Sequence, residues 1–361
     1  FDRKHTPEET SGARSYEDRR NAERDRQAEQ SLAGRDIGPL PEVVNPDRKA
    51  ACERNFQLFC ESYFPETYSL AWSPDHLKVI EKIETAVLRG GLFALALPRG
   101  SGKTTITESA ALWSMLYGHR EFVVLIGATE SAALELLDSL KTELEVNERL
   151  AEDFPEVCYP VAQLEGIANR CAGQLYKGER TRITWTSNEI VLPTVEGSKA
   201  SGIIVRVAGI TGRIRGMKFK RSDGRSVRPS LVIIDDPQTS ESAGSLEQTR
   251  KRVRVLAGDI LGLAGPGQKI SGIMPCTIIR PGDMADIILN RNTHPDWNGE
   301  KTRMVYRFPS NMKLWEEYAE IRAEALRTEG NFQKATEFYL ANREAMDAGA
   351  EVSWEARFNH D

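Results

Sequence analysis

The sequence has few of the residues that bind transition metals or form disulfide frameworks. Its 361 residues include five histidines and five cysteines, and no two of the cysteines form a CxxC pair. None of the cysteines is placed with a histidine at the spacing of a zinc site. We therefore expect reduced thiols, as in a cytoplasmic protein. The cysteines are Cys52, Cys60, Cys158, Cys171 and Cys276.

The chain also lacks an apolar run of membrane length, a secretory signal and an excess of positive charge. We therefore expect no membrane partner. The net charge is −5, so any contact with nucleic acid must come from a local basic patch. The length of 361 residues leaves room for one large or two medium domains, and the hydrophobic content of 40% is enough for a core. Because the first residue is Phe1, we expect a fragment or a processed chain.

The first 45 residues differ in composition from the rest. Residues 1–40 interleave acidic and basic side chains and contain few large apolar residues, which predicts a solvated helix or a disordered arm. The run Gly38-Pro39-Leu40-Pro41 is typical of a linker. We expect packed structure from residue 46 onward.

A glycine-containing loop organises the remaining chain. It reads Leu-Pro-Arg-Gly-Ser-Gly-Lys-Thr-Thr over residues 97–105, after an apolar run and before a pattern with helical spacing. A strand, such a loop and a helix in this order predict a phosphate-binding P-loop. The alternative is a turn that joins strand to helix and binds nothing. The predicted nucleotide-binding residues here are Pro98, Arg99, Gly100, Ser101, Gly102, Lys103, Thr104 and Thr105.

The chemistry of the loop follows from its residues. Gly100 and Gly102 allow a tight turn and close approach to an anion, and the helix that follows adds the positive end of its dipole. Lys103 would reach the β- and γ-phosphates of a nucleotide, and the Thr104 hydroxyl would hold Mg²⁺. A helix start at Ser73-Pro74-Asp75 lies upstream, and it places His76 where it could touch the edge of a base. The alternative is that His76 is only a first-turn residue.

A second motif lies at residues 231–236, which read Leu-Val-Ile-Ile-Asp-Asp. In doubly wound folds a carboxylate at the end of such a strand faces the phosphate loop. Asp235 would hold Mg²⁺, and Asp236 would orient or deprotonate the attacking water. Asp-Asp-Pro is also good turn chemistry, so a strand that simply ends in a turn is the alternative.

The pattern of apolar runs predicts an α/β protein with a mostly parallel sheet. Strands are expected at 122–126, 182–185, 189–192, 203–207, 269–274 and 304–308, and helices at 56–64, 131–146, 246–263, 314–326 and 332–346. The strand at 269–274 leads into Pro275, Cys276 and Thr277. The Thr277 hydroxyl could sense a γ-phosphate, or the residue could simply close the strand.

Positive charge is concentrated in residues 199–228. Nine basic residues in this stretch face a single acidic residue, Asp223. The stretch could contact a nucleic-acid backbone, direct arginines at a nucleotide, or form a solvated loop. The basic residues are Lys199, Arg206, Arg213, Arg215, Lys218, Lys220, Arg221, Arg225 and Arg228.

Together these motifs resemble the large terminase subunit of tailed bacteriophages, the ATP-driven motor that packages DNA. The resemblance covers roughly residues 50–358. It depends on the deviant P-loop with Arg99, the Gly-Arg-Ile-Arg-Gly segment at 212–216, the acidic strand at 232–236, and the Ser-Gly-Ile-Met-Pro-Cys-Thr run at 271–277, which is similar to a coupling motif.

The resemblance implies a P-loop NTPase of the RecA/ASCE type, with a mostly parallel central sheet flanked by helices and a small helical lid. The implied division is a charged arm and linker at 1–45, an ATPase core at 46–310, and a helical lid at 311–361 that leads toward a missing nuclease domain. The implied catalytic residues are Lys103, Asp236 and Arg99, which acts in cis. Residues 275–277 would couple hydrolysis to movement.

The resemblance also implies the ligands and partners. The cofactors would be ATP and Mg²⁺, and the substrate would be double-stranded DNA of any sequence. The partners would be a small terminase subunit, a portal or procapsid, and further copies of the chain in a ring, although the isolated domain could be monomeric. Arg213 or Arg215 could reach a neighbour's nucleotide or contact DNA. The expected location is the cytoplasm of an infected bacterial host.

Three departures from the family pattern keep other functions open. Many terminases have Asp-Glu where this chain has Asp235-Asp236, an adenine-contacting glutamine is not evident, and no room remains for a nuclease domain. The alternatives are a helicase-like DNA-dependent ATPase, a small-molecule kinase, and a nucleotide-gated module that binds DNA or a capsid partner with little hydrolysis. A helicase usually needs a second RecA-like domain, for which residues 278–361 look too short and too helical.

Overall fold

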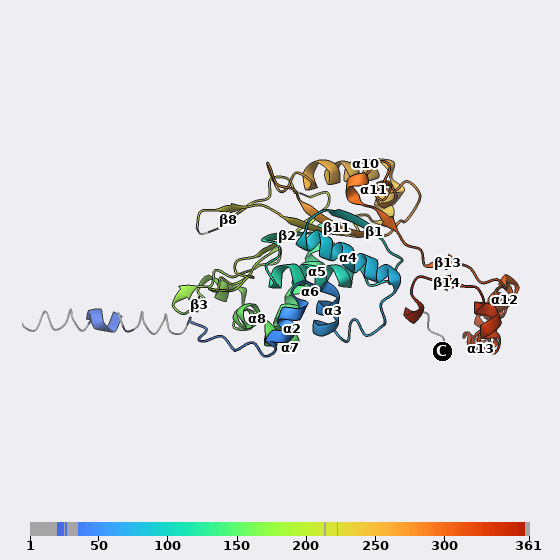
Figure 1. Ribbon diagram of the computed structural model, residues 1–361, viewed down its shortest axis with the longest axis horizontal. Helices are drawn as coiled ribbons and strands as arrows, with labels where there is room; N and C mark the ends of the chain where they lie inside the picture. Colours follow the sequence, from blue (N-terminus) through green and yellow to red (C-terminus); the bar gives the residue numbers. More distant parts are fainter. Residues whose placement is uncertain (1–19, 25, 27–34, 213, 222, 358–361) are drawn as a thin grey trace, which may run out of the picture.

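An eight-stranded, mostly parallel sheet forms the centre of the molecule in the computed structural model (Figure 1). The structure describes residues 20–24, 26, 35–212, 214–221 and 223–357, so most of the predicted arm at 1–45 lies outside it. In spatial order the strands are β12 (Glu300–Lys301), β1 (Leu92–Ala96), β11 (Ser271–Cys276), β10 (Leu231–Asp235), β2 (Phe122–Gly127), β7 (Ile204–Gly209), β6 (Glu189–Val191) and β5 (Thr184–Trp185).

The first six strands of this order run parallel, and β6 and β5 extend the sheet in antiparallel fashion. The central strands are apolar on both faces because helices cover both faces. Along β2, Val123 and Leu125 face one core cluster, whereas Phe122, Val124 and Ile126 face the other. The sequence prediction of an α/β protein with a mostly parallel sheet is therefore confirmed.

One face of the sheet packs against four helices, and the opposite face packs against the segment after β10 and the helix after β11 (Figure 1). The first group consists of α3 (Phe56–Tyr63), α4 (Pro74–Leu88), α5 (Lys103–Leu116) and α6 (Glu130–Val146), with α2 (Pro46–Cys52), α7 (Glu148–Asp153) and α8 (Pro155–Ala162) beside it. The second group consists of α10 (Leu246–Arg254), the π-helix η2 (Val255–Ile260) and α11 (Met284–Ile288). Three further short elements belong to this part: η1 (Ala168–Ala172), α9 (Ser240–Gly244) and η3 (Pro295–Trp297).

Helix α4 begins where its sequence predicted. The Ser73 hydroxyl accepts from the backbone N–H of His76, and the His76 ring accepts in return from the Ser73 N–H, so the two form a capping box. Pro74 occupies the first turn, where its missing N–H costs nothing. This start fixes His76 beside the loop at 97–102.

Two predicted elements differ from the structure. The helix expected at 246–263 is α-helical only to Arg254, and residues 255–260 form a π-helix, a local change that periodicity does not reveal. The strand expected at 304–308 exists as β13 (Val305–Arg307), but it pairs with β14 (Glu351–Val352) outside the central sheet. The edge of the sheet is instead the two-residue β12, too short to be found as an apolar run.

Between β13 and β14 in the sequence, the chain forms an antiparallel helix pair, α12 (Met312–Thr328) and α13 (Gln333–Asp347). The pair lies to the side of the sheet (Figure 1). The Trp315 indole N–H ties the pair by donating to the Met346 carbonyl at 2.8 Å. The chain then returns through β14 and the short turn η4 (Glu355–Arg357). In the described part of the chain, no helix combines the length and apolar character that a membrane span requires.

Candidate active site

The topology of the sheet brings three separate sequence motifs to one edge. Strands β1, β11 and β10 are parallel neighbours, so their carboxyl ends lie together. The loop at 97–102 follows β1, Thr277 follows β11, and Asp235 ends β10, with Asp236 directly after it. The motifs that sequence analysis singled out separately thus form one site.

The loop depends on two glycines at positive φ. Gly100 and Gly102 both have φ of 73°, a conformation that other residues rarely adopt. Gly102 caps α5, and Lys103 is the first residue of that helix. The backbone N–H groups at the start of α5 therefore lie at the loop, together with the positive end of the helix dipole.

Lys103 is buried and faces both other motifs. Its Nζ donates to the Thr277 hydroxyl at 2.8 Å and lies 3.8 Å from a carboxylate oxygen of Asp236. The Thr277 hydroxyl in turn lies 3.5 Å from the same Asp236 oxygen. A lysine, a hydroxyl and a carboxylate thus converge, with the cation available to an anion that enters between them.

Thr104 and Asp235 form a second pair. The Thr104 hydroxyl donates to one Asp235 oxygen at 2.9 Å, and the other Asp235 oxygen is buried without a hydrogen-bond partner among the described residues. Burial, together with the nearby Asp236 charge, raises the pKa of Asp235 to about 6, although the Thr104 hydrogen bond opposes the shift. A bound cation would satisfy the unpaired oxygen and favour the carboxylate.

This donor set fits Mg²⁺. The ion prefers hydroxyl, carboxylate, water and phosphate oxygens, and proteins commonly supply only one or two of its ligands. Thr104 and Asp235 can supply two, leaving the rest to a nucleotide and water. Across the described residues no group of three or more His, Cys, Asp and Glu side chains forms a metal cluster, and a magnesium–nucleotide site does not require one.

Asp236 has a strained backbone. Its φ is 35°, which is uncommon for a residue other than glycine, although aspartate and asparagine tolerate this region best. Its N–H donates to the Pro275 carbonyl at 3.1 Å, which fixes this turn against the end of β11. The side chain remains half exposed beside Lys103. Such strain at a polar site is typical of functional residues.

A cleft of about 530 Å³ opens at this edge, within the usual size of ligand sites. It contains Gln238, which sequence analysis did not single out. The Gln238 amide N–H₂ donates to the Thr277 carbonyl at 3.1 Å and to Asp283 at 2.8 Å, and its oxygen accepts from the Met284 N–H. In the sequence, the polar character of Gln238 and its position two residues after Asp236 could have indicated a place in the site. The cleft is lined by Arg99, Gly100, Gly102, Lys103, Thr104, Thr105, Asp236, Gln238, Thr239, Ser240, Thr277 and Ile279.

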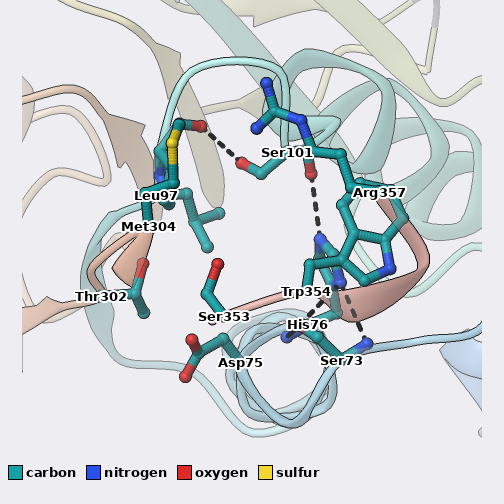
Figure 2. A pocket seen from close by; sticks show the side chains of 11 residues that line it. Ser73, Asp75, His76, Leu97, Ser101, Thr302, Met304, Ser353, Trp354 and Arg357 are labelled. Atoms are coloured by element: carbon teal, nitrogen blue, oxygen red, sulfur yellow. Dashed lines mark hydrogen bonds between the residues drawn. The ribbon is translucent and has the colours of Figure 1, made fainter. Parts of the chain in front are cut away.

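The remaining predicted residues take different places. His76 is buried beneath the loop, where its Nε2 lies 3.1 Å from the Ser101 carbonyl, and burial lowers its pKa (Figure 2). Pro275 and Cys276 are buried within β11, and burial raises the pKa of the Cys276 thiol. Of the 275–277 segment, only Thr277 reaches the cleft.

The basic stretch is partly neutralised. Residues 204–209 form β7, and a hairpin of β8 (Phe219–Lys220) and β9 (Ser226–Val227) follows; a similar hairpin, β3 (Leu175–Tyr176) and β4 (Glu179–Arg180), precedes it. Arg215 pairs with Asp259, whereas Arg213 lies outside the described residues. The other ion pairs in the stretch are Lys199–Glu53, Arg206–Glu189, Arg221–Glu121 and Arg225–Asp223.

Comparison with models of known protein families finds none that matches this chain. A search of curated proteins likewise finds no significant match. The functional argument therefore depends on the geometry of the site and on the motifs.

Glu108, on α5 near this site, gives a prediction about stability. Burial raises its pKa to about 7, although a hydrogen bond with Ser139 opposes the shift. Because the pKa is raised in the folded state, the contribution of Glu108 to stability is greatest below its ordinary pKa of 4.5 and is lost as the pH rises through about 7. We expect the free energy of unfolding of Glu108→Gln, minus that of the wild type, to increase by about 1–2 kcal/mol between pH 5 and pH 8.5.

Urea denaturation at the two pH values measures this difference. Glu135→Gln, which neutralises an exposed carboxylate on α6, is the matched control and should show no such growth. A Glu108→Gln effect that is the same at both pH values would contradict the prediction.

Proposed function

We propose that this chain is a Mg²⁺-dependent ATP hydrolase, the motor portion of a terminase large subunit that moves double-stranded DNA into a procapsid. The observation that carries the proposal is the convergence of Lys103, Thr104, Asp235, Asp236 and Thr277 at the carboxyl edge of three parallel strands. These are the residue types that bind and hydrolyse a nucleoside triphosphate in P-loop enzymes.

The strand order supports the same proposal. Strand β11 lies between β1, which precedes the loop, and β10, which carries the acidic pair. This order places the Thr277 hydroxyl between Lys103 and Asp236, where it can respond to a γ-phosphate. We assign the core to the RecA/ASCE type of P-loop NTPase, and residues 311–357 to a helical lid.

Each residue then has a role in hydrolysis. Lys103 and the loop amides neutralise charge that develops on the γ-phosphate, and Arg99, exposed at the rim of the cleft, adds to that stabilisation. Thr104 and Asp235 would hold Mg²⁺, which supplies charge neutralisation between the phosphates. Asp236 positions the attacking water and accepts its proton.

Contact with DNA is proposed for the part of the basic stretch that is not ion-paired. Lys218, Lys220 and Arg228 have no carboxylate partner within 4 Å in the described part of the chain. They would contact phosphates without reading bases, because a packaging motor must accept any sequence. The small subunit, the portal and neighbouring copies in a ring remain part of this proposal, with Arg215 a candidate to act across subunits.

Steady-state ATP hydrolysis, with and without linear double-stranded DNA, tests the proposal. We expect turnover that requires Mg²⁺, that DNA of unrelated sequences stimulates equally, and whose stimulation declines steeply as salt increases. Nucleotide binding by calorimetry without turnover would favour a nucleotide-gated binding module instead. No binding and no turnover would overturn the proposal.

A further inference from the structure

The end of the described chain returns to the phosphate loop, more than 250 residues after it (Figure 2). Ser353 donates its N–H to the Met304 carbonyl at 3.0 Å, which continues the pairing of β14 with β13. The Trp354 indole N–H donates to the Ala71 carbonyl at 2.7 Å. The Trp354 and His76 rings pack edge to face, with their centroids 4.6 Å apart. These contacts anchor the segment before it reaches Arg357.

Arg357 contacts the phosphate loop directly. Its Nη1 donates to the Arg99 carbonyl at 2.6 Å. The guanidinium lies so close to the next residue that a side-chain carbon at Gly100 would sit 2.6 Å from Nη2. Gly100 thus combines a positive φ, which favours glycine, with a close approach of the Arg357 guanidinium.

This contact fixes the orientation of one peptide group in the loop. In a trans peptide the C=O and N–H bonds point in opposite directions, and the Arg99–Gly100 bond is trans. Because Arg357 holds the Arg99 carbonyl, it also sets the direction of the Gly100 N–H. Gly100 lines the cleft with Lys103 and Thr104, whereas Arg357 does not line it, so an amide that points away from Arg357 is available to an anion in the cleft.

The charges around Arg357 favour an anionic ligand. Arg357 has no carboxylate partner within 4 Å in the described residues, and the one hydrogen bond that its side chain makes there is to a neutral carbonyl. It adds a third cation to a loop that already carries Arg99 and Lys103. Mutual repulsion of these groups is relieved when phosphates bind among them.

We propose that Arg357 is a positioning residue of the phosphate site: it holds the Arg99 carbonyl so that the Gly100 amide faces the phosphates of a nucleotide. The inference rests on the proposed function, because it assumes that the loop binds phosphate. It also makes the C-terminal segment part of the nucleotide site, so that the α12–α13 pair is mechanically linked to that site through β14.

The test is the variant Arg357→Ala in the full chain. Steady-state kinetics give its KM for Mg²⁺-ATP and its kcat, and calorimetry gives its Kd for ADP. A preoriented amide contributes equally to the ground and transition states, so we expect KM and Kd to rise about tenfold while kcat changes less than twofold. Arg357→Lys retains a donor for the Arg99 carbonyl and should restore part of the affinity.

Glu355→Ala is the matched control, since it alters an exposed side chain of the same short turn and should leave KM and Kd unchanged. Unchanged KM and Kd in Arg357→Ala would overturn the inference alone, provided that the wild type binds and hydrolyses ATP. Equal losses in kcat, affinity and Tm, with no recovery in Arg357→Lys, would show a merely structural role and also overturn it. A wild type that binds no nucleotide would remove the proposed function and this inference together.

Discussion

Lys103→Met should lower ATP turnover by at least about a thousandfold. The lysine is buried with its Nζ between the Thr277 hydroxyl and the Asp236 carboxylate, the place that a γ-phosphate would enter. Among the described residues that line the cleft, no other cation is buried, because Arg99 is exposed at its rim. Loss of Lys103 therefore removes charge neutralisation that the remaining donors cannot replace, and steady-state hydrolysis measures it.

The choice of methionine preserves the fold. Its unbranched side chain keeps the buried aliphatic stem of the lysine, so the thermal midpoint should remain near that of the wild type. Lys334→Met removes an exposed lysine on α13 and is the control for a simple change in net charge. Turnover by Lys103→Met within tenfold of the wild type would show that this loop is not a catalytic P-loop.

The parts of the site predicted from sequence are those that local patterns determine. Runs of apolar residues at 92–97 and 231–234 predicted the strands now seen as β1 and β10, because a strand buried on both faces must be apolar throughout. The glycines and Lys-Thr at 100–104 predicted the turn into α5. Parallel pairing then brings the strand ends together without further information from the sequence.

The parts that sequence analysis missed depend on contacts between distant residues. Trp354 and Arg357 belong to a short segment without periodicity, and only the pairing of β14 with β13 brings them to the loop. Gln238 gains its role from Asp283 and Met284, which lie more than 40 residues away. No local pattern encodes such partners.

Charge was the least reliable guide. The concentration of arginine and lysine at 199–228 left open a nucleic-acid contact, arginines directed at a nucleotide, or a solvated loop, and five of its eight described basic residues pair with carboxylates. Four of those carboxylates, such as Glu53 and Asp259, come from other segments. A net charge counted along the sequence therefore overstates the positive potential available to a ligand.

Asp236→Asn should lower kcat by about a hundredfold to ten-thousandfold while nucleotide binding is retained. The substitution keeps the size of the side chain, but it removes the negative charge beside Lys103 and with it the ability to accept a proton from water. Asparagine also tolerates the positive φ of 35° at this position, so the strained turn against Pro275 should persist. Single-turnover hydrolysis separates the chemical step from product release, and calorimetry with ADP measures binding.

Asp235→Asn distinguishes the two carboxylates. Asp235 accepts a hydrogen bond from the Thr104 hydroxyl, and its other oxygen is buried with no hydrogen-bond partner among the described residues. Its replacement should therefore raise the Mg²⁺ concentration needed for half-maximal turnover. Asp236 faces Lys103 and Thr277 instead. Its replacement should therefore leave the required Mg²⁺ concentration nearly unchanged. If Asp236→Asn hydrolysed ATP at the wild-type rate, the group that activates water would lie elsewhere in the cleft. If both variants shifted the Mg²⁺ requirement equally, the two carboxylates would act together on the metal rather than dividing metal binding and proton transfer between them.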